Sequence, residues 1–115
     1  MLKLNLQRQH LRLLLDILNH NTPGAEVWAY GSRVNGTAHE GSDLDLVLRD
    51  PSGLNRRQKQ LWRLREALRE SNLPMLVDVL DWARIPDDFR REIQRQHLCI
   101  RAAAAAEPVS ANFAS

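Results

Sequence analysis

Apolar residues recur at helical spacing near the start of the chain. They return every three or four positions, as on one face of an amphipathic helix: Leu11, Leu14, Leu15 and Leu18. This pattern predicts a helix over residues 5–20, with Asn5 as its N-cap. The polar cluster over residues 19–24, which contains Pro and Gly, predicts the turn that ends this helix.

Three short segments have the pattern of β-strands. Residues 25–30 are rich in strand formers and stop at Gly31. Residues 43–49 alternate strictly between two faces, one of which carries Asp43, Asp45 and Val47. Residues 75–82 form a third apolar run, whose length favours a buried strand over a helix.

Two further helices complete the predicted order. Leucines at helical spacing predict a helix over residues 54–71, long enough to make the second and third strands parallel neighbours through a right-handed crossover. Pro86 opens a last helix, whose apolar face runs through Ile85, Phe89, Ile93 and Ile100. The order helix, strand, strand, helix, strand, helix predicts a small α/β domain. We expect a mixed sheet of three or four strands packed with about four helices.

Length and composition indicate one globular domain. The 115 residues suit a single core, and 43% hydrophobic with 26% charged residues is ordinary for a globular protein. No apolar run approaches the ~20 residues of a membrane span, and charges interrupt the leucine-rich start, which argues against a signal peptide. We therefore expect a cytoplasmic domain over residues 1–101, followed by a flexible alanine-rich extension over residues 102–115. Cys99 is the only cysteine, which excludes an internal disulfide and a Cys-rich zinc site.

The charge of the chain is uneven. The formal net charge is +2, but residues 56–69 carry six basic side chains against Glu66 alone: Arg56, Arg57, Lys59, Arg63, Arg65 and Arg69. Such a run indicates either an anionic partner or a solvated helix face, and charge alone does not establish nucleic-acid binding. The three tryptophans, Trp28, Trp62 and Trp82, have apolar neighbours, so we expect them in the core rather than as platforms for nucleobases.

The candidate chemistry lies between the first two strands. Gly31 and Ser32 close the first strand, and ten residues later comes Asp43-Leu44-Asp45. Side chains two apart on a strand share a face at a spacing of ~6 to 7 Å, so both carboxylates converge on one spot and require a cation. Magnesium commonly binds through one or two carboxylates plus substrate phosphates. Gly31 lets the backbone approach a phosphate and Ser32 adds a hydroxyl donor, so the pattern predicts a metal and triphosphate site.

A third carboxylate is expected on the neighbouring strand. An in-line phosphoryl-type displacement benefits from a second metal and from a group that accepts the proton of the attacking hydroxyl. Asp78 lies between two valines in mid-strand, whereas Asp81 lies at the strand's end and faces the other way. A surface position on an edge strand is the alternative for Asp78. Arg33 is a candidate phosphate ligand and equally a surface arginine in a loop. The histidines lack metal-ligand spacing.

These residues resemble a known family. The segments 30–33 (Tyr-Gly-Ser-Arg), 42–46 (Ser-Asp-Leu-Asp-Leu) and 77–79 (Val-Asp-Val) are similar to the minimal nucleotidyltransferases of the DNA polymerase beta superfamily. Residues 70–74 and the pair Asp81-Trp82 resemble the MntA-like antitoxins that are paired with HEPN toxins. The resemblance runs from about residue 5 to residue 100 and implies the palm-like nucleotidyltransferase fold.

The same resemblance implies roles for the matched residues. Gly31 and Ser32 hold the triphosphate of ATP, with Arg33 and Ser42 as further nucleotide-binding candidates. The three carboxylates bind two Mg²⁺ ions and are the catalytic residues: Asp43, Asp45 and Asp78.

The resemblance also implies an activity and a partner. It implies transfer of AMP from ATP to a hydroxyl, expected to be that of a tyrosine, on a HEPN ribonuclease toxin, which is thereby neutralised. Larger relatives carry extra helical domains for the acceptor, so we expect a partner surface to supply it here, with neither a membrane nor nucleic acid required. Two alternatives stay open. One is a binding-only antitoxin with a vestigial site, and the other is a small-molecule nucleotidyltransferase that modifies an antibiotic or sugar hydroxyl.

Overall fold

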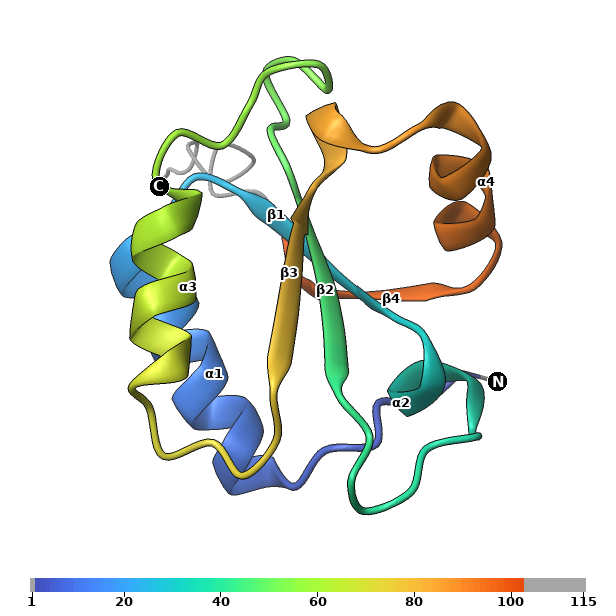
Figure 1. Ribbon diagram of the computed structural model, residues 1–115. Coiled ribbons are helices and arrows are strands. Elements are labelled where there is room, and N and C mark those ends of the chain that lie inside the picture. The colour runs from blue at the N-terminus through green and yellow to red at the C-terminus, as the bar shows by residue number, and fades with distance from the viewer. Residues whose placement is uncertain (1, 103–115) are drawn as a thin grey trace, which may run out of the picture.

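Four strands form one mixed sheet at the centre of the chain. The fold is taken from a computed structural model, which describes residues 2–102 (Figure 1). The sheet has the order β3-β2-β1-β4, and its strands are β1 (Glu26–Tyr30), β2 (Leu44–Arg49), β3 (Val77–Asp81) and β4 (His97–Arg101). Strand β1 is antiparallel to both β2 and β4, whereas β2 and β3 are parallel. The remaining elements are α1 (Arg8–Asn21), α2 (Ser32–Asn35), α3 (Leu61–Arg69), the 3₁₀ turn η1 (Trp82–Arg84) and α4 (Asp87–Arg95).

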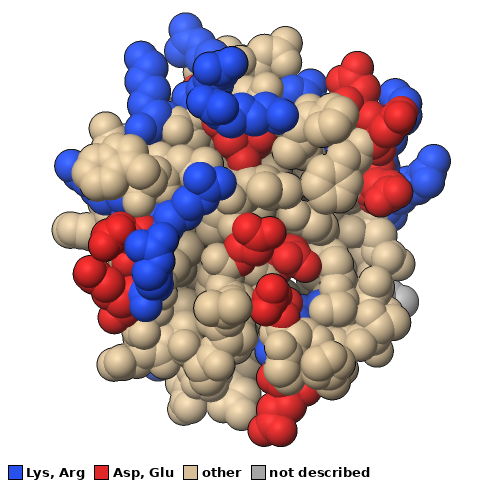
Figure 2. Space-filling model, viewed as in Figure 1, with Lys and Arg blue, Asp and Glu red and all other residues tan. Residues whose placement is uncertain are grey.

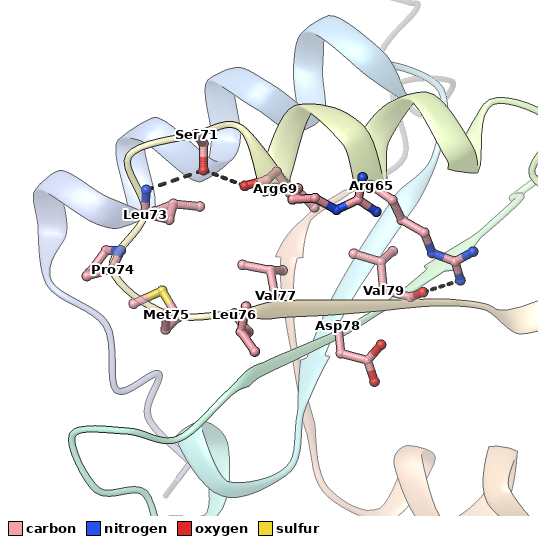
Figure 3. A pocket seen from close by; sticks show the side chains of 11 residues that line it. Arg65, Arg69, Ser71, Leu73, Pro74, Met75, Leu76, Val77, Asp78 and Val79 are labelled. Carbon is pink, nitrogen blue, oxygen red and sulfur yellow. Dashed lines mark hydrogen bonds between the residues drawn. The ribbon is translucent and has the colours of Figure 1, made fainter.

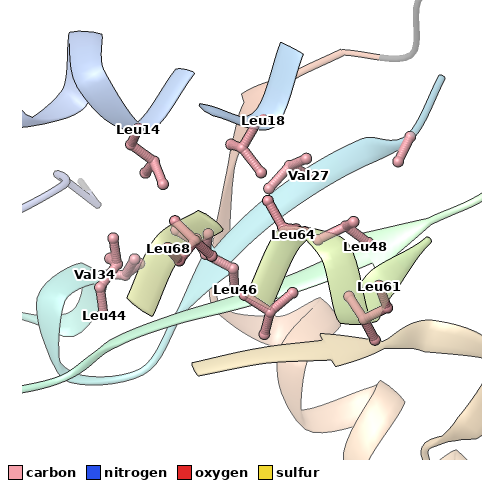
Figure 4. Packing of buried hydrophobic residues seen from close by; sticks show 13 residues of the cluster. Leu14, Leu18, Val27, Val34, Leu44, Leu46, Leu48, Leu61, Leu64 and Leu68 are labelled. Atoms are coloured by element: carbon pink, nitrogen blue, oxygen red, sulfur yellow. The ribbon is translucent and has the colours of Figure 1, made fainter. Parts of the chain in front are cut away.

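Helices α1 and α3 cover one face of the sheet (Figures 1 and 4). Alternate residues of the central strand β2, namely Leu44, Leu46 and Leu48, are fully buried against this pair of helices. The helices contribute mainly leucines at helical spacing: Leu14, Leu18, Leu61, Leu64 and Leu68. Because side chains alternate along a strand, burial of these leucines directs Asp45 to the opposite face.

Helix α4 covers only part of that opposite face. It packs through Ile93 and Phe89 against a second cluster built on Trp28, Val47 and Trp82. Helix α4 does not cover the start of β2, since Val47 is fully buried whereas Asp45 is only half-buried. The end of β1 and the start of β2 therefore face outward on the α4 side of the sheet.

The predicted strands and the parallel pairing are confirmed. The three strands expected over residues 25–30, 43–49 and 75–82 begin and end within two residues of β1, β2 and β3. Strands β2 and β3 are joined through α3 and run parallel, as the crossover predicted. The sheet has a fourth strand, which the expected range of three or four allowed.

The last predicted helix is too long. Helix α4 ends at Arg95, and residues 97–101, including Ile100, form strand β4 against β1. Ile93 and Ile100, which the sequence placed on one helical face, pack into different clusters, Ile100 against the core formed with α1 and α3. The strand is favoured because it pairs the backbone of β1 on its open side and buries Leu98 and Ile100 at the same time.

The starts of the first two helices also differ from expectation. Helix α1 begins at Arg8 with Gln7 as N-cap, and Asn5 lies before the helix, where its backbone N–H donates to the Arg33 carbonyl at 2.7 Å. Helix α3 begins at Leu61 rather than at residue 54. The preceding segment is held in turns, and the Gln58 N–H donates to the buried carboxylate of Asp81 at 2.8 Å.

Two of the three tryptophans lie in the core, as expected, and the third does not. Trp28 and Trp82 are 8% and 2% exposed, whereas Trp62 is 64% exposed on the outer face of α3. The alanine-rich extension expected over residues 102–115 lies, apart from residue 102, outside the described residues. Among the helices of the described part, none is both long and apolar enough to cross a membrane.

The unequal burial of the tryptophans gives a stability test. Trp82→Ala should lower the free energy of unfolding by about 3 to 5 kcal/mol, because it empties a packed site in the second cluster. Trp62→Ala is the matched control and should change the free energy of unfolding by no more than about 0.5 kcal/mol. Urea denaturation measures both values, and equal losses would contradict the assigned burial.

Candidate active site

Three neighbouring strands bring a row of polar side chains together. Asp45 on β2 is in register with Tyr30 on β1 and with Asp78 on β3. Residues in register on adjacent strands share a face, so all three side chains point away from α1 and α3. Figure 2 shows acidic side chains gathered near the middle of this face, over the region of β2 and β3. The sequence prediction that Asp45 and Asp78 lie side by side is confirmed by this register.

Asp43 precedes β2 and lies beside this row. It is exposed, and it raises the pKa of Asp45 by its charge, which places it within electrostatic reach of Asp45. The pKa of Asp45 is raised first by burial of its carboxyl, then by Asp78 and then by Asp43. The charges of both other predicted carboxylates therefore reach Asp45.

The turn at Gly31 is shaped around Asp45. Gly31 has φ +81°, and a Cβ atom built on it would lie only 2.5 Å from Oδ2 of Asp45. Both the backbone conformation and the closeness of this carboxylate require glycine. Ser32 follows as the first residue of α2, and the Gly31 carbonyl accepts from the N–H groups of Val34 and Asn35. Gly31 thus joins the end of β1 to α2 close to the Asp45 carboxylate.

Arg33 is buried and positions the loop between α2 and β2. Its Nε and Nη2 donate to the Ser42 carbonyl at 3.0 and 2.8 Å, and its Nη1 donates to the Asn5 carbonyl at 2.9 Å. The hydroxyl of Ser42 accepts from the His39 N–H at 2.9 Å. These bonds fix the approach to Asp43 and give Arg33 a positioning role. Phosphate contacts from Arg33 and Ser42 stay predictions. For Arg33 such a contact is disfavoured, because its guanidinium already donates three hydrogen bonds to backbone carbonyls.

Asp81 has a structural role and lies three residues after Asp78, on the other face of β3. Its carboxylate is 3% exposed and accepts from the Gln58 and Ala83 N–H groups at 2.8 and 3.2 Å. Asp81 therefore anchors the segment before α3 and the η1 turn, away from the Asp45 row.

Sequence reasoning did not assign Tyr30 to the site. Its pKa is raised by burial and by the charges of Asp45 and Asp78, so the hydroxyl stays protonated beside the two carboxylates. The signal was present in the strand alternation, which puts Trp28 and Tyr30 on one face. A cavity of about 270 Å³ opens beside Tyr30 and Gly31, between α2 and α4.

The donor set suits a hard divalent cation. Carboxylate oxygens are the ligands that Mg²⁺ takes in proteins, and such an ion would stabilise the Asp45 carboxylate, whose pKa is raised by burial and then by the charges of Asp78 and Asp43. Over residues 2–102, no three acidic, histidine or cysteine side chains are gathered closely enough to hold a metal ion as they stand. A metal site at these aspartates therefore needs small side-chain movements, or further ligands from the substrate.

The sequence also matches a family model of the nucleotidyltransferase domain over residues 11–103. The chain belongs to the nucleotidyltransferase domain family. As a family member it is similar to the "Probable protein adenylyltransferase MntA" of Haemophilus influenzae, with 39% identity over 99 residues, which are 86% of this chain and 85% of that protein. The match to the family model spans the Gly31-Ser32 turn and all three aspartates.

Solved structures confirm the nucleotidyltransferase fold. One, described as a toxin-antitoxin with AMP-PNP, superimposes with a TM-score of 0.66 at 20% identity and covers 84% of this chain and 76% of its own. Another, described as the toxin-antitoxin MntA-HepT, has a TM-score of 0.60 at 16% identity and covers 87% and 76%. The mixed sheet with helices on both faces is therefore the nucleotidyltransferase fold that the sequence resemblance implied.

Two glycines provide a matched test of the contact with Asp45. Gly31 and Gly36 both have positive φ, at +81° and +87°, but a Cβ at Gly36 would meet nothing within 4 Å. Gly36→Ala should cost only the backbone strain, about 1 to 2 kcal/mol in the free energy of unfolding. Gly31→Ala should cost more, because it also displaces the Asp45 carboxylate. Urea denaturation compares the two, and equal costs would contradict the close approach.

The raised pKa of Asp45 predicts a pH-dependent stability. Asp45→Asn should raise the free energy of unfolding at neutral pH, because it removes a charge that burial, Asp78 and Asp43 disfavour. The folded-state pKa lies above the unfolded one, so the penalty of the wild-type carboxylate grows as pH rises between the two values and is complete above both. Below about pH 3 the carboxyl is protonated in both states and the gain should vanish.

Urea denaturation over a pH series measures this gain. Asp16→Asn, an exposed substitution on α1, is the control for removing one negative charge elsewhere. A loss of stability for Asp45→Asn at neutral pH would contradict the assigned repulsion.

Proposed function

We propose that this chain transfers AMP from ATP to a tyrosine hydroxyl of a HEPN-type ribonuclease toxin in the cytoplasm and so neutralises it. One observation carries the proposal: Asp45 lies between the Gly31-Ser32 turn and Asp78, on the part of a nucleotidyltransferase sheet face that α4 leaves uncovered. The 39% identity to a protein named as a probable protein adenylyltransferase supports a protein as acceptor. The toxin-antitoxin structures of similar fold support a toxin as the partner.

Gly31 and Ser32 are proposed to receive the triphosphate. Gly31 has no side chain to keep a phosphate from the backbone, and the Ser32 hydroxyl can donate to a phosphate oxygen. Asp43, Asp45 and Asp78 would hold Mg²⁺, which neutralises phosphate charge and polarises the α-phosphoryl group when bound. The oxygens of a bound triphosphate would supply the further ligands that the described side chains lack.

The transfer step balances as a single displacement. The acceptor hydroxyl oxygen forms a bond to the α-phosphorus, and the bond from that phosphorus to the bridging oxygen of the β-phosphate breaks. Pyrophosphate leaves with that oxygen. We propose that Asp78 takes the hydroxyl proton, supported by its exposure on the side of Asp45 away from Gly31.

Label transfer tests the proposal. With ATP labelled at its α-phosphate and a HEPN-type toxin as acceptor, the unaltered protein should label the toxin. The double variant Asp43→Asn with Asp45→Asn should reduce labelling to background and leave the toxin active, because the metal and nucleotide lose their ligands. Mg²⁺ should also raise the Tm of the unaltered chain, but not that of the double variant.

The controls separate the three candidate functions. Asp16→Asn removes a charge from α1 on the other face and should keep full label transfer. A double variant that still protects cells from the toxin would indicate a binding-only antitoxin. Label transfer to a small hydroxyl compound with no toxin present would indicate a small-molecule nucleotidyltransferase.

A further inference from the structure

The order of the strands fixes the side from which an acceptor reaches the site. Attacking and leaving oxygens lie roughly in line on opposite sides of the phosphorus. Gly31 ends β1, Asp45 is on β2 and Asp78 is on β3, and these strands are consecutive in the sheet. With phosphates at Gly31, the leaving pyrophosphate lies on the β1 side and the attacking hydroxyl on the β3 side. The acceptor therefore enters over β3.

Strand β3 is an edge of the sheet with outward-facing peptide groups. The Leu76 carbonyl accepts from the Leu44 N–H of the chain leading into β2, at 2.9 Å. By the alternation of a parallel pair, the N–H and C=O groups of Val77 and Val79 face away from β2. The Arg65 side chain confirms this direction, because its Nη2 donates to the Val79 carbonyl at 2.7 Å. Such an edge can accept an added strand.

A groove follows this edge between β3 and the end of α3. Its volume is about 360 Å³, and the side chains of Arg65 and Arg69 lie along its α3 side (Figure 3). Asp78 projects from the other side of the strand, away from α3 (Figure 3). Leu76, which is 75% exposed, lies two residues before Asp78 and so on the same face. The groove is thus lined by two arginines on its α3 side and by Leu76 beside the site.

We propose that this groove binds the acceptor segment of the toxin as an extended strand on β3, with acidic residues of that segment against Arg65 and Arg69. This inference rests on the proposed function and names the surface that presents its acceptor. Added strands lie about 4.8 Å from an edge strand and share its alternation. A residue opposite Asp78 would then point its side chain to the face of Asp45, while its neighbours turn toward α3.

The charges of the groove favour an acidic segment. The groove is lined by two cationic side chains, Arg65 and Arg69, and the pair of Arg69 with Glu66 at 3.0 Å lies on the exposed surface, where such ion pairs are weak. Arg65 holds only a backbone carbonyl, which an incoming peptide N–H can take over. An exposed leucine beside Asp78 offers a contact for the ring of a tyrosine acceptor. A nucleic acid strand is the competing ligand for such arginines, and the test separates the two.

Steady-state AMP transfer to the toxin tests the groove through paired substitutions. Arg69→Glu and Leu76→Ser should each raise the KM for the toxin about tenfold, with kcat and the KM for ATP changed less than about twofold. The controls are Arg57→Glu, from the same basic run, and Leu54→Ser, a leucine that is 42% exposed; neither residue lines the groove. Both controls should keep the KM of the unaltered chain.

Hydrogen exchange tests the added strand directly. The amides of Val77 and Val79 should exchange quickly in the free chain and become protected when the toxin binds in the presence of a non-hydrolysable ATP analogue. Unchanged exchange at both amides, or groove variants that behave like their controls, would overturn the inference.

The two proposals fail in different ways. Failure of the proposed function is absence of AMP transfer by the unaltered chain. This inference fails if AMP transfer is intact and neither Arg69→Glu nor Leu76→Ser changes the KM for the toxin. Arg69→Glu could also lose binding to a labelled oligoribonucleotide while the KM for the toxin stays unchanged. That result would indicate that the groove binds RNA, and it would overturn the inference.

Discussion

The site depends on carboxylates that the sheet holds together against their own repulsion. Asp45 and Asp78 are in register on neighbouring parallel strands, and burial, followed by the charges of Asp78 and Asp43, raises the pKa of Asp45. Burial on the other face of the sheet opposes this repulsion. Leu44, Leu46 and Leu48 are fully buried beneath α1 and α3, and a slip of one residue would bring the aspartates into that core. The hydrophobic face therefore fixes the position of the acidic one.

The backbone around the carboxylates is adapted to the same constraint. Gly31 provides both a positive φ and the missing Cβ that leaves room for Asp45 Oδ2. Arg33, two residues later, binds the carbonyls of Ser42 and Asn5 and so ties the N-terminal segment to the loop before Asp43. The loop that presents the first aspartate is thus held by a buried cation, while the strand that presents the second is held by the core.

What the sequence could predict here depends on whether a residue's role is local. The alternation of residues 43–49 and the Gly-Ser to Asp-x-Asp spacing are local, and they predicted the strand, the turn and the carboxylates. The role of Arg33 is set by carbonyls 9 and 28 residues away, which no local pattern reveals. Strand β4 was missed because seven residues separate Ile93 from Ile100, a helical spacing, and only pairing with β1 favours a strand. Segment 54–60 was missed because a distant carboxylate, Asp81, holds it in turns.

The parallel pairing of β2 and β3 has a consequence for access to the site. It places Asp78 on an edge strand, so the carboxylate row runs to the boundary of the sheet rather than ending under a helix. Helix α3, which makes the crossover, brings Arg65 and Arg69 to that same boundary. A negatively charged partner is attracted to the arginines and repelled by the aspartates until a cation neutralises them. Under the proposed function, acceptor and metal-bound nucleotide would meet at one edge, and their charges would favour binding together over binding of the acceptor alone.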